Sequence, residues 1–194
     1  MDMQGSRHLA VTQQQAWEAL NDPEVLKICI PGCDKVEATG ENQYAIGMAV
    51  KIGPVAARFN GKILLADVLP PNSYTLAFEG QGGAAGFGKG SAKVNLAPAV
   101  EGAGCELAYT AQAQVGGKIA QVGQRLVDGV AKSMAEDFFR RFDEEMQRRH
   151  PVEVAAEKAL AGAEAALPSP RKMPIWVWIV FAVVVLLALL LLAR

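Results

Sequence analysis

Residues 105–142, with the sequence CELAYTAQAQVGGKIAQVGQRLVDGVAKSMAEDFFRRF, contain the change of hydrophobic period that decides the fold. Before Gly116 and Gly117 the apolar residues alternate with polar ones, which is typical of a strand with one dry face and one wet face. After the two glycines they recur at three- and four-residue steps, which is typical of an amphipathic helix. The stretch therefore predicts a strand and then one helix of roughly thirty residues, whose apolar stripe covers the dry face of a sheet.

Further alternating runs upstream predict antiparallel strands. They cover residues 3–11, 35–38, 44–52, 55–65, 74–79 and 92–96. Two short helices are expected after the first of these strands. Thr12 suits the N-cap of the first helix, and Asp22-Pro23 supplies the N-cap and the first position of the second. The chain thus predicts a sheet and one long helix, with two small helices near the start.

These elements together predict an α+β helix-grip domain over residues 1–149, in which a curved antiparallel sheet surrounds one long helix. Because one helix does not close a strongly curved sheet completely, we expect an apolar cavity, open at one end, between the two. The candidate ligand-binding residues lie on the inward phase of the strands, in a glycine-rich turn or on the apolar stripe of the helix: Tyr44, Met48, Phe59, Tyr74, Phe78, Phe87, Tyr109, Val122, Leu126, Val130 and Met134. A tyrosine hydroxyl at such a position either hydrogen-bonds a ligand carbonyl or is satisfied by backbone or water.

The segment GQGGAAGFGKG at residues 80–90 allows two interpretations. It is either a plain glycine-rich hairpin or a loop at the cavity mouth with Phe87 as an apolar gate. A nucleotide site is not expected, because a strand rather than a helix follows and Gly90 stands where a P-loop needs Ser or Thr. Gly123 and Gly129, within the predicted helix, indicate either close packing or room for a flat ring.

A separate hydrophobic feature is the segment 175–193, which carries no charged side chain. At ~1.5 Å per residue a helix of this length spans roughly 28 Å, about the hydrocarbon thickness of a bilayer. We therefore expect a single C-terminal transmembrane helix that anchors the protein, with Trp176, Trp178 and Phe181 among its residues.

Residues 150–174 are rich in Ala and Glu and then in Pro, which indicates a linker between the domain and the anchor. The basic pair Arg171-Lys172 precedes the apolar segment, and the N-terminus lacks the pattern of a signal peptide. By the positive-inside rule we expect a single-pass protein of the bacterial cell membrane with its N-terminal domain in the cytoplasm.

The composition makes several other functions poor candidates. The net charge of the 194-residue chain is −1, so no nucleic-acid partner is expected. The three cysteines, Cys29, Cys33 and Cys105, predict free thiols and no metal site. We predict no catalytic residue, and hence no enzyme, because His8 and His150 stand at opposite ends of the domain and no paired carboxylates fall on the inward phases.

Four segments carry a resemblance to a known family. They are IPGC at 30–33, KIGPVAARFNGKILLADVLPP at 51–71, YTLAFEGQGGAAGFGKGSAKVNL at 74–96 and GGKIAQVGQRL at 116–126. These segments resemble the CoxG family of carbon monoxide dehydrogenase proteins, which belongs to the START-like (SRPBCC) superfamily, whose members typically bind hydrophobic ligands. The resemblance implies an accessory protein that holds a molybdenum-containing carbon monoxide dehydrogenase, or a related hydroxylase, at the membrane.

An apolar cavity, a lipid membrane and a redox partner together favour a respiratory quinone, menaquinone or ubiquinone, as the bound ligand. The hypothesis is therefore a non-catalytic protein that recruits the hydroxylase to the cytoplasmic face and presents a quinone for electron delivery. Two alternatives stay open: an assembly or maturation factor for the same enzyme with a packed cavity, and a small cyclase or hydrolase of the same fold.

Overall fold

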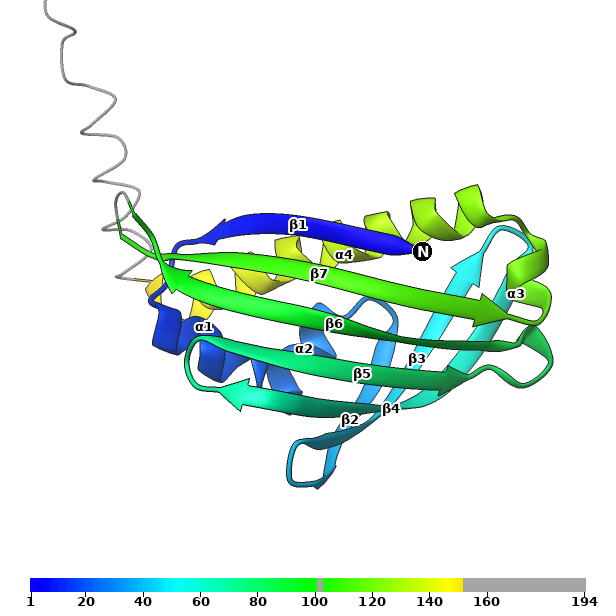
Figure 1. The fold of residues 1–194 in the computed structure, drawn as a ribbon, viewed down its shortest axis with the longest axis horizontal. Helices are drawn as coiled ribbons and strands as arrows, with labels where there is room; N and C mark the ends of the chain where they lie inside the picture. The colour runs from blue at the N-terminus through cyan, green and yellow to red at the C-terminus, as the bar shows by residue number, and fades with distance from the viewer. Residues whose placement is uncertain (101–102, 152–194) are drawn as a thin grey trace, which may run out of the picture. The chain divides into compact units, whose positions relative to one another are not determined.

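The computed structural model describes residues 1–100 and 103–151, which form a sheet with helices along one side of it (Figure 1). The strands are β1 (Asp2–Leu9), β2 (Cys33–Gly40), β3 (Gln43–Ile52), β4 (Val55–Leu69), β5 (Ser73–Gln81), β6 (Phe87–Pro98) and β7 (Cys105–Gly116). They form one seven-stranded sheet in the order β1-β7-β6-β5-β4-β3-β2, and every neighbouring pair is antiparallel. The predicted antiparallel sheet is confirmed.

The helices are α1 (Gln13–Leu20), α2 (Pro23–Cys29), a 3-10 turn η1 (Gly83–Ala85), α3 (Lys118–Gln121) and α4 (Gln124–Arg149). The α1 N-cap prediction is confirmed, because Thr12 Oγ1 accepts from the Gln15 backbone N–H at 3.3 Å and Gln15 Oε1 accepts from the Thr12 backbone N–H at 2.9 Å. Asp22 caps α2 by accepting from the Glu24 N–H at 2.9 Å, with Pro23 at the first helical position. Helix α4 lies along the sheet behind it in Figure 1, which confirms the helix-grip arrangement.

The prediction of a single long helix is wrong in one respect, because Gly123 divides it. Gly123 has φ +97° and precedes α4, while Val122 ends the single turn α3. This left-handed conformation strains any residue with a Cβ, so glycine is needed there to turn the chain, and neither predicted role for it applies. Gly129 does lie in α4, but it is exposed and an added Cβ would meet no atom within 4 Å, so close packing does not explain it.

The glycine-rich segment 80–90 forms a hairpin, as one of its two interpretations predicted. Strand β5 continues to Gln81, the turn η1 reverses the chain, and β6 begins at Phe87, earlier than the predicted residue 92. Gly80 pairs directly with Gly88 in this hairpin. The strand extends further than the alternation of large residues because the backbone ladder continues through the glycines.

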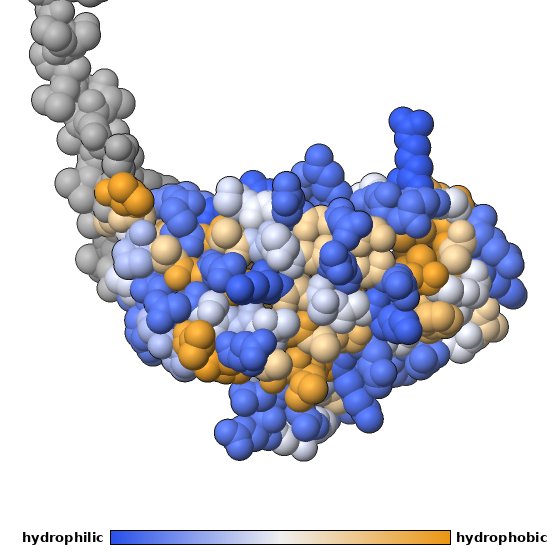
Figure 2. All heavy atoms as spheres, viewed as in Figure 1, coloured by the Kyte–Doolittle hydropathy of each residue, from blue (hydrophilic) through white to orange (hydrophobic). Residues whose placement is uncertain are grey.

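The packed core fills the space between sheet and α4 at the end where α1 and α2 lie. Trp17 and Tyr74 meet edge to face with ring centroids 5.6 Å apart, and Tyr109 lies against Phe139 at the same separation. Phe142, Cys29 and Cys105 are completely buried in this cluster. The view from the side opposite α4 shows mostly hydrophilic residues with hydrophobic ones between them (Figure 2), as expected for the wet face of the sheet.

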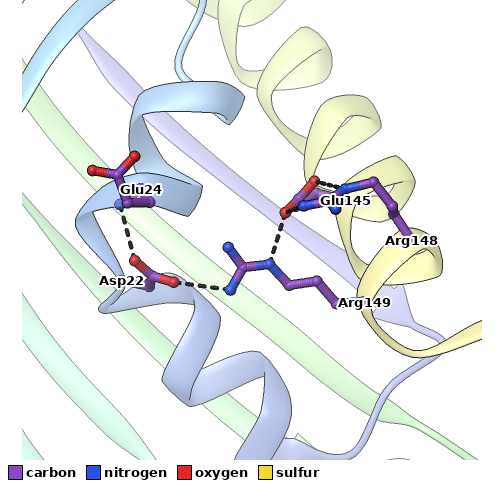
Figure 3. A network of polar contacts seen from close by, with 5 residues as sticks. All are labelled: Asp22, Glu24, Glu145, Arg148 and Arg149. Carbon is purple, nitrogen blue, oxygen red and sulfur yellow. Dashed lines mark hydrogen bonds and ion pairs between the residues drawn. The ribbon is translucent and has the colours of Figure 1, made fainter.

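A network of ion pairs fixes the end of α4 to the junction between α1 and α2 (Figure 3). Arg149 Nε donates to Glu145 Oε1 at 2.7 Å, and Arg149 Nη1 donates to Asp22 Oδ2 at 2.9 Å. Arg148 makes two further hydrogen bonds to the Glu145 carboxylate, at 2.6 and 2.8 Å. These hydrogen bonds, those of Arg148 first, lower the pKa of Glu145 to about 2.

Two predicted elements fall outside the described residues, wholly or in large part. The first is the membrane anchor 175–193, with Trp176, Trp178 and Phe181. The second is the linker 150–174, of which only residues 150 and 151 are described. Within residues 1–100 and 103–151, the structure contains no helix of the length and apolar character that a bilayer crossing requires. The anchor and the linker stay predictions from the sequence.

Candidate ligand-binding cavity

A cavity of about 350 Å³ lies between the inner face of the sheet and α4, at the end away from the packed core. Strands β3 to β7 supply one wall, and α3 and α4 supply the other. Nearly all of its lining surface is apolar. Its lining residues include Ile46, Met48, Val50, Phe59, Ile63, Phe78, Val115, Ile119, Val127, Val130, Ala131 and Met134. The predicted gap between one curved sheet and one helix is therefore present.

The walls of this cavity differ from an ordinary core in their burial. Met48, Phe59, Phe78 and Met134 are only half-buried, although they face the inside of the domain. Apolar surface left accessible in this way is stabilised by an apolar occupant, at roughly 25 cal/mol for each Å² removed from water. The arrangement therefore suits a hydrophobic ligand held by shape rather than by charge.

Five of the predicted site residues line the cavity: Met48, Phe59, Phe78, Val130 and Met134. The inward phases of β3, β4 and β5 were predicted correctly, and so was the stripe along the middle of α4. Among the lining residues absent from the predicted list are Val127, Ala131 and the three glycines Gly61, Gly80 and Gly88. Val127 and Ala131 begin a second row of apolar residues at four-residue steps, continued by Ala135 and Phe139, and this row is the sequence signal that could have identified them.

The three tyrosines have partners elsewhere in the protein. Tyr74 is buried in the core against Trp17, and burial raises the pKa of its hydroxyl. Tyr109 packs on Phe139 in the same core. The Tyr44 hydroxyl donates to the backbone carbonyl of Asn21 at 3.4 Å. None of the three is among the residues that line this cavity.

Phe87, Val122 and Leu126 also lie outside the cavity lining. Phe87 alternates with Gly88, which faces the cavity, so its side chain points to the opposite face, where its ring covers Gly116. Leu126 is 41 % exposed, because the break at Gly123 turns the start of α4 so that Val127 rather than Leu126 faces inward. Val122 is at the break itself.

Few polar side chains lie around the cavity. Lys62, Glu79 and Lys89 contribute to its edge, but they occupy the outward phase of their strands. A larger, more polar hollow of about 790 Å³ on the outward side shares these residues and is less suited to an apolar ligand. In the described part of the chain no three His, Cys, Asp or Glu side chains lie together as metal ligands.

The fold and the cavity define a helix-grip domain of the START-like class. The family model for CoxG, which is described as a carbon monoxide dehydrogenase subunit, matches residues 5–147. The chain belongs to the CoxG family.

Solved structures share the fold of this chain. The chain is 35 % identical to a conserved protein from Geobacillus kaustophilus, with a TM-score of 0.71 over 76 % of this chain and 96 % of that one. It also has the fold of an aromatase/cyclase from Streptomyces sp. R1128, with 13 % identity and a TM-score of 0.57 over 77 % of this chain and 94 % of that one. A comparison with curated proteins found no match. Family membership indicates a role associated with carbon monoxide dehydrogenase.

Proposed function

We propose that this protein is a non-catalytic accessory factor that recruits a molybdenum-containing carbon monoxide dehydrogenase, or a related hydroxylase, to the cytoplasmic face of the bacterial membrane. It carries a respiratory quinone in its cavity and presents the quinone to the enzyme as electron acceptor. The observation that carries the proposal is the apolar cavity with its half-buried walls. Family membership supports the enzyme partner.

The size of the cavity suits part of a quinone. Ligand pockets commonly measure roughly 300–1,000 Å³, and about 350 Å³ lies near the lower limit. A quinone ring and the first part of its tail fit such a volume, and the rest of a long tail extends out of the open end. A lining with few hydrogen-bonding groups holds the ring by contact alone, which favours release to an enzyme or to the bilayer.

The apolar segment 175–193 supports the membrane component of the proposal. Quinones with long tails reside in the bilayer, so a cavity tethered beside it has a local supply. A soluble dehydrogenase needs such a link, because its electrons must reach the lipid phase. Recruitment and quinone transfer are therefore two parts of one task.

The test is a strain that lacks this chain and retains the dehydrogenase. We expect its extracts to keep carbon monoxide oxidation with a soluble dye as acceptor, while its membranes lose carbon-monoxide-dependent quinone reduction. Restoring the full chain restores quinone reduction. Loss of the dye activity as well, with enzyme that lacks its molybdenum cofactor, would instead support the assembly-factor alternative.

A further inference from the structure

The floor of the cavity contains a row of glycines on three neighbouring strands. Gly61 of β4 pairs with Gly80 of β5, and Gly80 pairs with Gly88 of β6. All three line the cavity. A strand interior normally avoids glycine, because glycine loses the most backbone entropy on folding and offers no side chain to pack. Each of these glycines therefore requires a reason.

Gly61 has its reason in the backbone. A Cβ at Gly61 would overlap the carbonyl oxygen of Glu79 on the neighbouring strand, and one at Gly90 would overlap that of Gln112. At these two points the strands approach too closely for any side chain. Gly61 and Gly90 are thus required by the sheet itself.

The neighbouring backbone does not require glycine at positions 80 and 88. The nearest atom to an added Cβ is the carbonyl oxygen of Asn60, at 3.9 Å, for Gly80 and Cγ1 of Val115, at 4.0 Å, for Gly88. Neither residue adopts a positive φ. The surroundings would accept a Cβ at both positions, so neither steric crowding nor backbone conformation requires glycine there.

Two phenyl rings mark the limits of this bare floor. The Phe59 ring lies against Gly82 and the Phe78 ring against Gly90, since an added Cβ at those glycines would meet ring carbons at 2.5 and 2.6 Å. Gly80 lies midway between Phe78 and Gly82 along the chain. At ~3.3 Å per residue the Cα atoms of Phe78 and Gly82 each lie roughly 7 Å from that of Gly80. Between the two rings, this part of the cavity lining is therefore peptide backbone without side chains.

We infer that the Gly80–Gly88 pair is a seat for a planar ring, which lies face-on against the two bare strands. This inference rests on the proposed function of the cavity as a ligand site. A flat aromatic or quinonoid ring gains dispersion contacts over its whole face only where no side chain stands between it and the backbone. A flexible acyl chain needs no such patch, so the glycine pair selects planar ligands over acyl chains.

The test compares variants that place a side chain in the seat with a variant of a matched glycine outside the cavity. Gly80→Val and Gly88→Val fill the seat. Gly40→Val is the control, because Gly40 is a strand glycine outside the cavity lining with φ in the ordinary range and its added Cβ meets only Gln43, at 3.8 Å or beyond. Calorimetry on the full chain in detergent micelles measures the binding of 2-methyl-1,4-naphthoquinone, a planar probe, and of dodecanoate, an acyl probe.

We expect the two seat variants to weaken binding of the naphthoquinone by about tenfold or more, the factor that corresponds to ~1.4 kcal/mol. Dodecanoate binding changes by less than about threefold, and the control binds both probes as the wild type does. Gly80→Ala provides a second measurement, because a Cβ that the fold accepts raises the melting temperature by about 1–4 °C.

Equal naphthoquinone affinity in the wild type and the seat variants would overturn the seat and leave the ligand cavity standing. An equal loss of both probes would overturn the selection for planar rings. A lower melting temperature for Gly80→Ala would show that the fold does require the glycine. A wild type that binds neither probe would overturn the ligand cavity itself.

Discussion

Replacing Glu145 with Gln is predicted to cost the domain a large, pH-dependent part of its stability. The Glu145 side chain is only 6 % exposed and accepts hydrogen bonds from Arg148 and Arg149. Its pKa falls from an ordinary 4.5 to about 2. At about 1.4 kcal/mol for each pKa unit, this difference corresponds to roughly 3 kcal/mol of stabilisation at neutral pH.

The pH range of this contribution follows from the direction of the pKa change. Because the folded-state pKa of Glu145 lies below its unfolded-state value, the stabilisation is complete above about pH 4.5 and is lost as the pH falls toward 2. Glu145→Gln removes this component, so its unfolding free energy should fall by about 2–3 kcal/mol at pH 7 and approach the wild-type value near pH 2.

The assay is urea denaturation of the full chain in detergent, followed by far-ultraviolet circular dichroism at several pH values. The control is Glu144→Gln on the preceding residue of α4. Glu144 pairs with Arg140 at 2.8 Å, but both side chains are exposed, so this change should cost less than about 0.5 kcal/mol. Equal losses for the two variants, or a wild-type advantage over Glu145→Gln that does not shrink toward pH 2, would show that the ion pairs of Glu145 do not stabilise the domain.

Three further predictions concern the break, the thiols and the tail. Gly123→Ala should destabilise the domain by about 1–2 kcal/mol, because φ at this residue is +97°. Gly129→Ala, on the exposed side of helix α4, should stabilise it by about 0.5–1 kcal/mol. A change of the same sign for both variants in thermal denaturation would contradict this. Iodoacetamide should label half-buried Cys33 well before Cys29, because Cys29 is fully buried and burial raises its pKa to about 11. Equal labelling rates by peptide mass spectrometry would argue against the burial of Cys29. Ending the chain before Pro168 should leave a folded domain that still binds the dehydrogenase and no longer sediments with membranes; an unfolded product would mean that the tail is part of the fold.

The elements of the fold were predictable because each has a local signal. Thr12 with Gln15, and Asp22 with Pro23, mark the helix starts by short-range hydrogen bonding, and the structure confirms both. The alternation along the strands likewise identified the side of the sheet that faces α4. These signals depend on chain neighbours alone, so one sequence was enough to detect them.

The cavity was predictable only in outline. Its lining depends on where α4 begins, and the positive φ at Gly123 cannot be deduced from a helical period that continues across it. The placement of Tyr74 and Tyr109 depends on which inward positions lie near α1 and α2, and this follows from strand register across the sheet. The difference between Gly61 and Gly80 is a matter of strand approach, which the sequence does not encode locally.

The most direct test of the proposed function is the identity of the molecule that the cavity carries. The full chain is purified in detergent from the cells that produce it, extracted with organic solvent and examined by mass spectrometry, alongside the cavity-filling variant Ala131→Phe. We predict menaquinone or ubiquinone with the wild type, in an amount comparable with the protein, and a large loss from the folded variant. Phospholipid alone, no lipid, or equal quinone in both samples would contradict the proposal.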